Sequence, residues 1–246
     1  YLAGAGGSWL WLALGVLAIV LLGAMLATVL MVKERPAAGG SRLPLRSALY
    51  QSFKVDTRAN RNFVLFLVSR LLMLVAFLTV QRYALYFLMD VVGVANPAAT
   101  TADLLMVVGA SVLVTAYPVG RLSDRVGRRP VILSSGLIGA SGIAVLFLSS
   151  SYIQVMLCGA LLGVSFGAFM STNWALATEL VVKGEEARYL GLTNLATAGG
   201  AAMARLIGLA IDYFNSYCFG LGYQFMLVVC FIYFIAGSLL VFMIKR

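Results

Sequence analysis

Seven long apolar runs, separated by short polar segments, account for most of the chain. Most of them are close to the 20 or so residues that an α-helix needs to cross the hydrocarbon core of a bilayer. They cover residues 9–32, 63–90, 103–119, 131–148, 152–177, 188–212 and 223–244. The pattern predicts an all-α, polytopic membrane helix bundle with seven transmembrane helices.

The composition agrees with a membrane protein. Hydrophobic residues make up 62% of the 246 residues and charged residues 11%, whereas soluble domains are about 45–50% apolar. The net charge of +9 does not indicate a nucleic-acid partner, because the basic residues lie in the gaps between apolar runs. The chain has no histidine, and its three cysteines show no paired spacing. We therefore expect no metal site, no cofactor and no disulfide.

The distribution of lysine and arginine predicts the orientation. Fifteen of the eighteen fall within residues 33–61, 121–129, 183–188 and the C-terminus, which share one side if the spans alternate. The loops on the other side, around 91–101, 149–151 and 213–222, contain none. Basic loops stay in the cytoplasm, so residue 1 is expected outside and the C-terminus inside. The expected location is the bacterial cytoplasmic membrane.

Residues 33–62 form a polar, basic linker. Leu45, Leu49 and Phe53 recur in it at four-residue spacing beside basic residues. This spacing predicts a short helix on the membrane surface, and a linker without structure is the alternative.

The segment from Gly120 to Pro130 holds four arginines, one aspartate and two glycines between two apolar runs. Its order is G-x-L-x-D-R-x-G-R-R, which resembles the loop signature of the major facilitator superfamily of secondary transporters. The matching residues are Gly120, Leu122, Asp124, Arg125, Gly127, Arg128 and Arg129.

The resemblance implies half of a transporter. Such proteins usually have two six-helix bundles joined by a cytoplasmic linker. Residues 1–32 would then be helix six of the N-terminal bundle, 33–62 the linker, and 63–246 the C-terminal bundle. The rest of the N-terminal bundle would be missing from this sequence.

The resemblance also gives the Gly120–Pro130 segment a role. It implies a cytoplasmic gate latch, in which Asp124 faces a helix end or a basic partner of the other bundle. Arg125, Arg128 and Arg129 would pair with nearby carboxylates or helix ends. The alternative is a hairpin that only sets topology.

Polar residues inside the spans are candidates for contact with a solute. One helix face of residues 188–212 carries a polar and small-residue stripe: Asn194, Thr197, Ala201, Arg205, Gly208 and Asp212. An arginine near the middle of a span faces protein or water rather than lipid. Arg205 is therefore either a substrate contact or a structural arginine.

The second run carries further polar residues. Gln81, Arg82 and Tyr86 are expected to line a cavity. Arg70 is within snorkelling reach of an interface, so we expect it to anchor the helix there.

Glycines mark a close helix contact. Gly159, Gly163 and Gly167 recur every four residues, so one helix face is nearly bare and another helix can approach it. The uncharged runs 131–148 and 223–244 are expected to be the most lipid-exposed of the last six.

Two hypotheses about function follow. The first is a secondary transporter half that works by alternating access on a small solute, with an oxygen-rich or anionic solute favoured by the arginines. The second is a transporter-like subunit or assembly factor of a membrane complex, for example a pigment–protein complex, which would have other membrane subunits as partners. The sequence shows no nucleophile–base pair, so we do not expect an enzyme.

Overall fold

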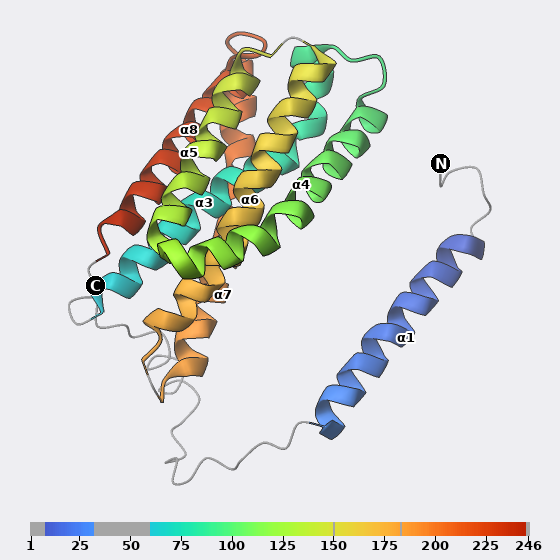
Figure 1. Ribbon diagram of the computed structural model, residues 1–246. Helices are drawn as coiled ribbons and strands as arrows, with labels where there is room; N and C mark the ends of the chain where they lie inside the picture. The colour runs from blue at the N-terminus through green and yellow to red at the C-terminus, as the bar shows by residue number, and fades with distance from the viewer. Residues whose placement is uncertain (1–7, 32–59, 150, 183, 245–246) are drawn as a thin grey trace. The chain divides into compact units, whose positions relative to one another are not determined.

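The computed structural model describes residues 8–31, 60–149, 151–182 and 184–244 (Figure 1). The chain divides into two compact units, Tyr1–Ala48 and Leu49–Arg246. In the first unit, α1 (Ser8–Met31) is a 24-residue helix, and the side chains of residues 11–31 are all exposed. The surface helix expected around Leu45, Leu49 and Phe53 lies outside the described residues.

The second unit is a bundle of six long helices. The first of them ends in a short π-helical turn, η1 (Leu88–Val92). The six helices are α3 (Arg61–Phe87), α4 (Pro97–Val126), α5 (Arg128–Phe147), α6 (Tyr152–Leu180), α7 (Glu186–Asn215) and α8 (Leu221–Phe242). Within the described residues, these helices and α1 give seven that are long and apolar enough to cross a membrane, as predicted.

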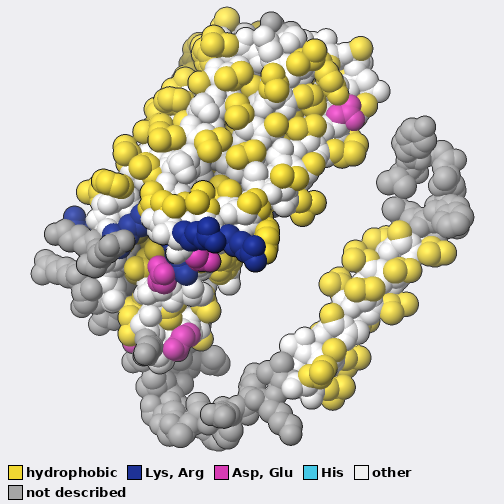
Figure 2. Space-filling model, in the orientation of Figure 1, with side chains coloured by type: hydrophobic (Ala, Val, Ile, Leu, Met, Phe, Trp, Pro, Cys, Tyr) yellow, Lys and Arg dark blue, Asp and Glu magenta, His cyan; other side chains and the backbone are white. Residues whose placement is uncertain are grey.

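The surface of the six-helix unit suits lipid. Hydrophobic side chains cover most of the visible face, and Lys and Arg gather where α4 meets α5 (Figure 2). Large side chains such as Leu113 (80% exposed) and Leu209 (68% exposed) lie on this surface. A soluble monomer rarely exposes apolar patches of this extent. The chain is an integral membrane protein.

Local residues explain where the helices begin. Asn96 caps α4 by accepting a hydrogen bond from the backbone N–H of Ala99 (3.2 Å), and Pro97 occupies the first turn. Ser151 caps α6 in the same way through the N–H of Gln154 (3.4 Å). Such caps satisfy backbone donors that a helix start leaves without partners.

The expected loop between the third and fourth spans is largely helical. Helix α4 continues to Val126 and α5 begins at Arg128, so Gly127 alone separates them. Gly127 has φ +102°, a conformation that side-chain-bearing residues rarely adopt. One glycine therefore supplies the whole break, and the residues on either side of it gain helical hydrogen bonds. We call this end of the bundle, where α4 meets α5, the motif end.

Helix α4 packs mainly against α6. Gly159, Gly163 and Gly167 of α6 lie at this contact: a Cβ added at Gly163 would lie 2.6 Å from the carbonyl oxygen of Val108 and 2.7 Å from the Cβ of Ser111. Pro118 lies inside α4, which is visibly bent (Figure 1), as expected for a proline that interrupts the helical hydrogen bonds.

The expectation that the fourth and seventh spans are the most exposed is wrong for this unit. Helix α5 buries half of its most apolar stretch and α8 buries 39%, whereas α7 buries 17% and α4 none. The reason is close packing between α5 and α8. A Cβ at Gly136 would lie 2.5 Å from the Cβ of Ser238, and one at Gly139 would lie 2.8 Å from the Phe234 ring. An uncharged sequence suits contact with another helix as well as contact with lipid.

Candidate functional site

Arg128 joins the start of α5 to the C-terminal part of α6. Its Nη1 donates a hydrogen bond to the carbonyl oxygen of Ala175 and lies 3.1 Å from Oε1 of Glu179. Its Nη2 lies 4.0 Å from Oδ1 of Asp124, at the edge of ion-pair distance. A cation is favourable near the C-terminal end of a helix, where the carbonyl groups point outward. Arg128 is thus paired within the unit.

The other residues of the Gly120–Pro130 segment surround this contact. Gly120 approaches Ser171 of α6, since a Cβ there would lie 3.8 Å from the Ser171 Cβ. The guanidinium of Arg121 stacks 4.7 Å from the centroid of the Tyr117 ring. The side chains of Leu122 and Arg125 are exposed, and that of Arg129 is half-buried.

A polar pocket of ≈ 300 Å³ lies at the motif end, lined by Asp124, Arg128, Arg129 and Glu179 among others. The Asp124 side chain is 67% exposed, compared with 21% for Arg128. Arg128 therefore holds the α4–α5 junction to α6, while Asp124 presents its carboxylate at the surface.

The candidate solute-binding residues on α7 differ in how far their side chains are exposed. Asn194, Arg205 and Asp212 are exposed, and Thr197 is half-buried. Among the described residues, the Arg205 side chain forms no hydrogen bond or ion pair, but its backbone carbonyl accepts a hydrogen bond from the Tyr83 hydroxyl at 3.0 Å. That bond joins α7 to α3.

The candidates on α3 are also at the surface. Gln81, Arg82 and Tyr86 are all exposed, and Tyr86 is 50% exposed. Asp90, in the π-helical turn η1 that follows, accepts a hydrogen bond from the Tyr223 hydroxyl of α8. Gln81 is the candidate that reaches the cavity described next.

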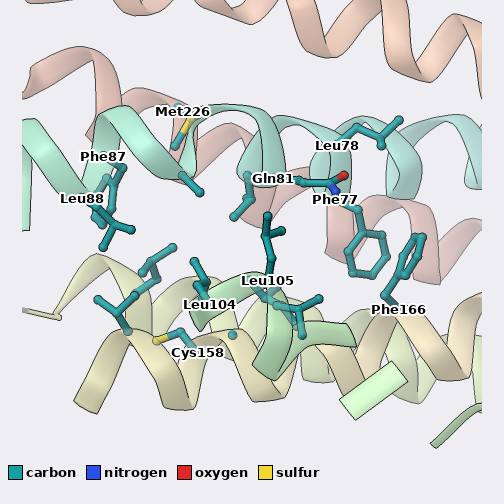
Figure 3. A pocket seen from close by; sticks show the side chains of 17 residues that line it. Phe77, Leu78, Gln81, Phe87, Leu88, Leu104, Leu105, Cys158, Phe166 and Met226 are labelled. Carbon is teal, nitrogen blue, oxygen red and sulfur yellow. The ribbon is translucent and has the colours of Figure 1, made fainter. Parts of the chain in front are cut away.

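An apolar cavity of ≈ 120 Å³ lies between α3, α4 and α6, with further walls from α5 and α8. Gln81 is the one lining residue with a strongly polar side chain, and Figure 3 shows it among the apolar side chains of the wall. Phe77 and Phe166 also line the cavity, with ring centroids 4.8 Å apart. Its volume resembles that of engineered apolar cavities of about 150 Å³ that bind benzene. The cavity suits a small apolar group.

Arg70 is placed differently from the sequence prediction. It is 1% exposed and lies in the interior of the unit, so it does not anchor α3 at an interface. Its Nη1 donates to Oδ1 of Asn173, its Nε and Nη2 donate to Oγ1 of Thr197 at 3.2 and 3.1 Å, and Trp174 stacks on its guanidinium. Arg70 thereby joins α3, α6 and α7.

The sequence did not predict this cluster, because the polar character of each residue could be explained by its position in its own helix. Asn173 and Trp174 are close to a helix end, and Arg70 is within reach of one. Their meeting depends on how three helices pack. The one signal in the sequence is that three polar side chains occupy otherwise apolar spans.

The comparison with protein families gives a match over most of the chain. Residues 71–246 match the model of the Major Facilitator Superfamily. This range contains five of the six helices of the second unit in full, together with most of α3.

Individual relatives match shorter stretches. The chain is 30% identical over 90 residues to the minor myo-inositol transporter of Bacillus subtilis (strain 168), which covers 37% of this chain and 20% of that protein. It is 30% identical over 121 residues to the class E tetracycline resistance protein of Escherichia coli, covering 49% and 30%. It is 33% identical over 97 residues to a major facilitator-type transporter of Psilocybe cyanescens, covering 39% and 18%.

The matched stretches are 18% to 30% of the length of these relatives, which are named as transport or resistance proteins rather than enzymes. The family match covers well over half of this chain. It agrees with the helical bundle and with the order of residues around Gly127. The chain belongs to the major facilitator superfamily.

Proposed function

We propose that this chain forms half of a secondary transporter that moves a small solute across the membrane by alternating access, with a second six-helix bundle as its partner. The family match supports membrane transport in general. The names of two relatives, a myo-inositol transporter and a tetracycline resistance protein, support a small organic solute. In such a protein two bundles move against each other around a site near the bilayer midplane.

The proposal rests on a difference between two charged side chains at the motif end, Arg128 and Asp124. Arg128 is paired with Glu179 and the Ala175 carbonyl inside the unit, which fixes the α4–α5 junction on α6. Asp124 stays 67% exposed and touches Arg128 only at 4.0 Å. An exposed carboxylate at the end of a packed helix is suited to bind a cation or a helix N-terminus on another bundle. Residues 120–130 would thereby act as a latch on the cytoplasmic side.

The exposure of the helices supports a second bundle. Helix α4 buries none of its most apolar stretch and α7 buries 17%, although α7 carries the polar side chains of Asn194 and Arg205 on its exposed surface. A polar helix face is costly against lipid. A second bundle, or water in a pathway between two bundles, would provide a more favourable surface for it.

The solute proposed here is oxygen-rich or anionic. Arg82 and Arg205 are exposed, and Gln81 lines an apolar cavity. Such groups would bind oxygens of a solute that passes along α3 and α7.

The hypothesis of a non-transporting subunit is weakened, because one surface that could bind a partner chain is already covered. The bare face of Gly159, Gly163 and Gly167 would have suited a helix of a partner chain, but α4 of the same chain packs there. The transport hypothesis needs no partner on that face.

The latch can be tested by cysteine accessibility in the full-length protein. Single cysteines would replace Leu113, Val114 or Tyr117, which are exposed on α4, in a background where Cys218 is serine. A membrane-impermeant maleimide is added to the cytoplasmic side of vesicles. Asp124→Asn removes a charge-assisted hydrogen bond of about 1.5–3 kcal/mol, so labelling should rise by about tenfold or more.

Asp103→Asn is the matched control. Asp103 lies on α4 near its other end, where its carboxylate accepts a hydrogen bond from Tyr152 (3.1 Å). This variant should leave labelling from the cytoplasmic side unchanged. If Asp124→Asn also leaves it unchanged at all three positions, residues 120–130 only set topology.

A further inference from the structure

Arg70 is a buried cation in the middle of an apolar unit. It lies nine residues into α3, or roughly 13 Å along the helix at 1.5 Å per residue. With 1% of its surface exposed, its guanidinium has lost almost all contact with solvent. Burial of a charge is costly unless an opposite charge and hydrogen bonds compensate for it.

Its known partners are neutral. Arg128 forms ion pairs with Asp124 and Glu179, whereas Arg70 forms none with the described residues. Arg70 has instead the oxygens of Asn173 and Thr197 and the ring of Trp174, 4.4 Å from its Cζ. These contacts use three of the five N–H groups of a guanidinium, and none of them neutralises the charge.

A second donor beside Arg70 is also without a partner. The Nδ2 group of Asn173 is buried and makes no hydrogen bond in the described part of the structure. It belongs to the same carboxamide whose oxygen accepts from Arg70. A buried amide donor normally finds an acceptor. The unused donors of both side chains therefore require an oxygen acceptor, and the uncompensated charge of Arg70 favours an anionic one.

The cluster lies one side chain below the surface. Trp174 stacks on Arg70 and is itself 39% exposed. Trp174 is therefore the most exposed of the residues that contact the guanidinium. The exposed arginines differ in this respect, because Arg82 and Arg205 keep one side of their charge outside the protein.

We propose that Arg70 and Asn173 form a binding site for the anionic oxygen group of a small solute, with a carboxylate as the simplest case. Two free N–H groups of Arg70 and the Nδ2 of Asn173 donate to it, and Trp174 closes over it. A carboxylate accepts two parallel hydrogen bonds from a guanidinium, so it provides both the missing charge and the missing acceptors.

The inference deepens the proposed transport function by naming the group that the solute carries, and it rests on that function only in treating the solute as cargo. The experiment below measures binding alone. A protein that binds the anion without transporting it would refute the proposed function and leave the site standing.

The test is the thermal unfolding of the purified full-length protein in detergent, with acetate as the probe. Sodium acetate replaces sodium chloride at constant ionic strength. A ligand that binds only the folded state raises Tm in a saturable way. The expected rise is about 1–3 °C, because 1 kcal/mol shifts Tm by about 2–4 °C at 150–250 residues and by less in a longer protein.

Three variants make the result specific. Arg70→Gln should abolish the rise. Asn173→Asp puts a carboxylate next to the guanidinium, so it should also abolish the rise while keeping the protein folded, and it decides the matter if Arg70→Gln does not fold. Arg61→Gln removes an exposed charge from the same helix and should leave the rise intact.

Two results would overturn the proposal. The first is a rise that is linear in acetate, or equal in wild type and Asn173→Asp, because it would be a general salt effect. The second is no rise in wild type. A Tm loss in Arg70→Gln that shrinks at acid pH would then identify the reason. That pattern means that a carboxylate side chain elsewhere in the protein already pairs with Arg70 and becomes protonated when left alone.

Discussion

Two arginines, Arg128 and Arg70, contact the same helix, α6. Arg128 pairs with a carboxylate, whereas the hydrogen-bond partner of Arg70 on this helix is neutral. At the motif end, Arg128 meets Glu179 at 3.1 Å and is partly exposed. Six residues earlier on α6, Arg70 meets Asn173, a neutral side chain, and is buried. The comparison shows that an exposed, paired arginine can be a fixed joint between helices. A buried arginine without a counter-charge leaves a site that a ligand can complete.

The largest effect is expected from removing the buried arginine. Arg70→Ala leaves the oxygens of Asn173 and Thr197 without their donor and opens a cavity among three helices. The change also removes a buried charge that has no counter-charge, but we expect the loss of three hydrogen bonds and the new cavity to outweigh this relief, so the free energy of unfolding should fall by about 3 kcal/mol. Thermal unfolding in detergent measures it. Arg61→Ala, at an exposed position on the same helix, is the control. An equal loss in the two variants would mean that the buried arginine is no more important for stability than an exposed one, so the contrast with Arg128 would not hold.

A smaller effect is expected from separating α4 from α6. Gly163→Ala places a Cβ 2.6 Å from the carbonyl oxygen of Val108, so the helices must move apart at a cost of about 1–3 kcal/mol. Because α4 carries Asp124 and does not touch Arg70, the change should loosen the motif end and spare the buried cluster.

Gly191→Ala is the control for that change. Gly191 is also helical, but a Cβ there meets nothing within 4 Å. Alanine should therefore stabilise this helix by about 0.5–1 kcal/mol. Equal losses in the two variants, measured by thermal unfolding, would show that the close approach of α4 to α6 has no special importance.

The smallest effect is expected at the exposed ion pair. The Glu179 side chain is 55% exposed, and such pairs contribute about 1 kcal/mol or less, which salt screens. Glu179→Gln should lower Tm slightly at low salt and less at high salt. A salt-independent loss as large as that of Arg70→Ala would mean that the two arginines are equivalent.

The sequence was sufficient for the parts of the fold that depend on one helix at a time. The seven spans follow from apolar length alone, and the order of residues around Gly127 identifies the family. Helix ends were less accurate. The third span was predicted to end at residue 119, but α4 continues to Val126, because charged side chains at the edge of a bilayer do not stop a helix.

The parts that depend on several helices could not be predicted. Whether Arg70 reaches an interface or the interior depends on where α6 and α7 place Asn173 and Thr197. Likewise, absence of charge in α5 fits both lipid contact and the packing of Gly136 on Ser238. An uncharged helix face can contact either lipid or another helix, and only the structure shows which of the two it contacts.

The most direct test of the account uses Trp174 as a reporter, since its ring lies 4.4 Å from the Arg70 guanidinium. In the full-length protein, every other tryptophan, including Trp9 and Trp11, is replaced by phenylalanine, and Trp174 emission is followed as acetate replaces chloride. The account predicts a saturable change in emission that disappears in Arg70→Gln. A flat titration, or one that is linear and the same in Arg70→Gln, would contradict it.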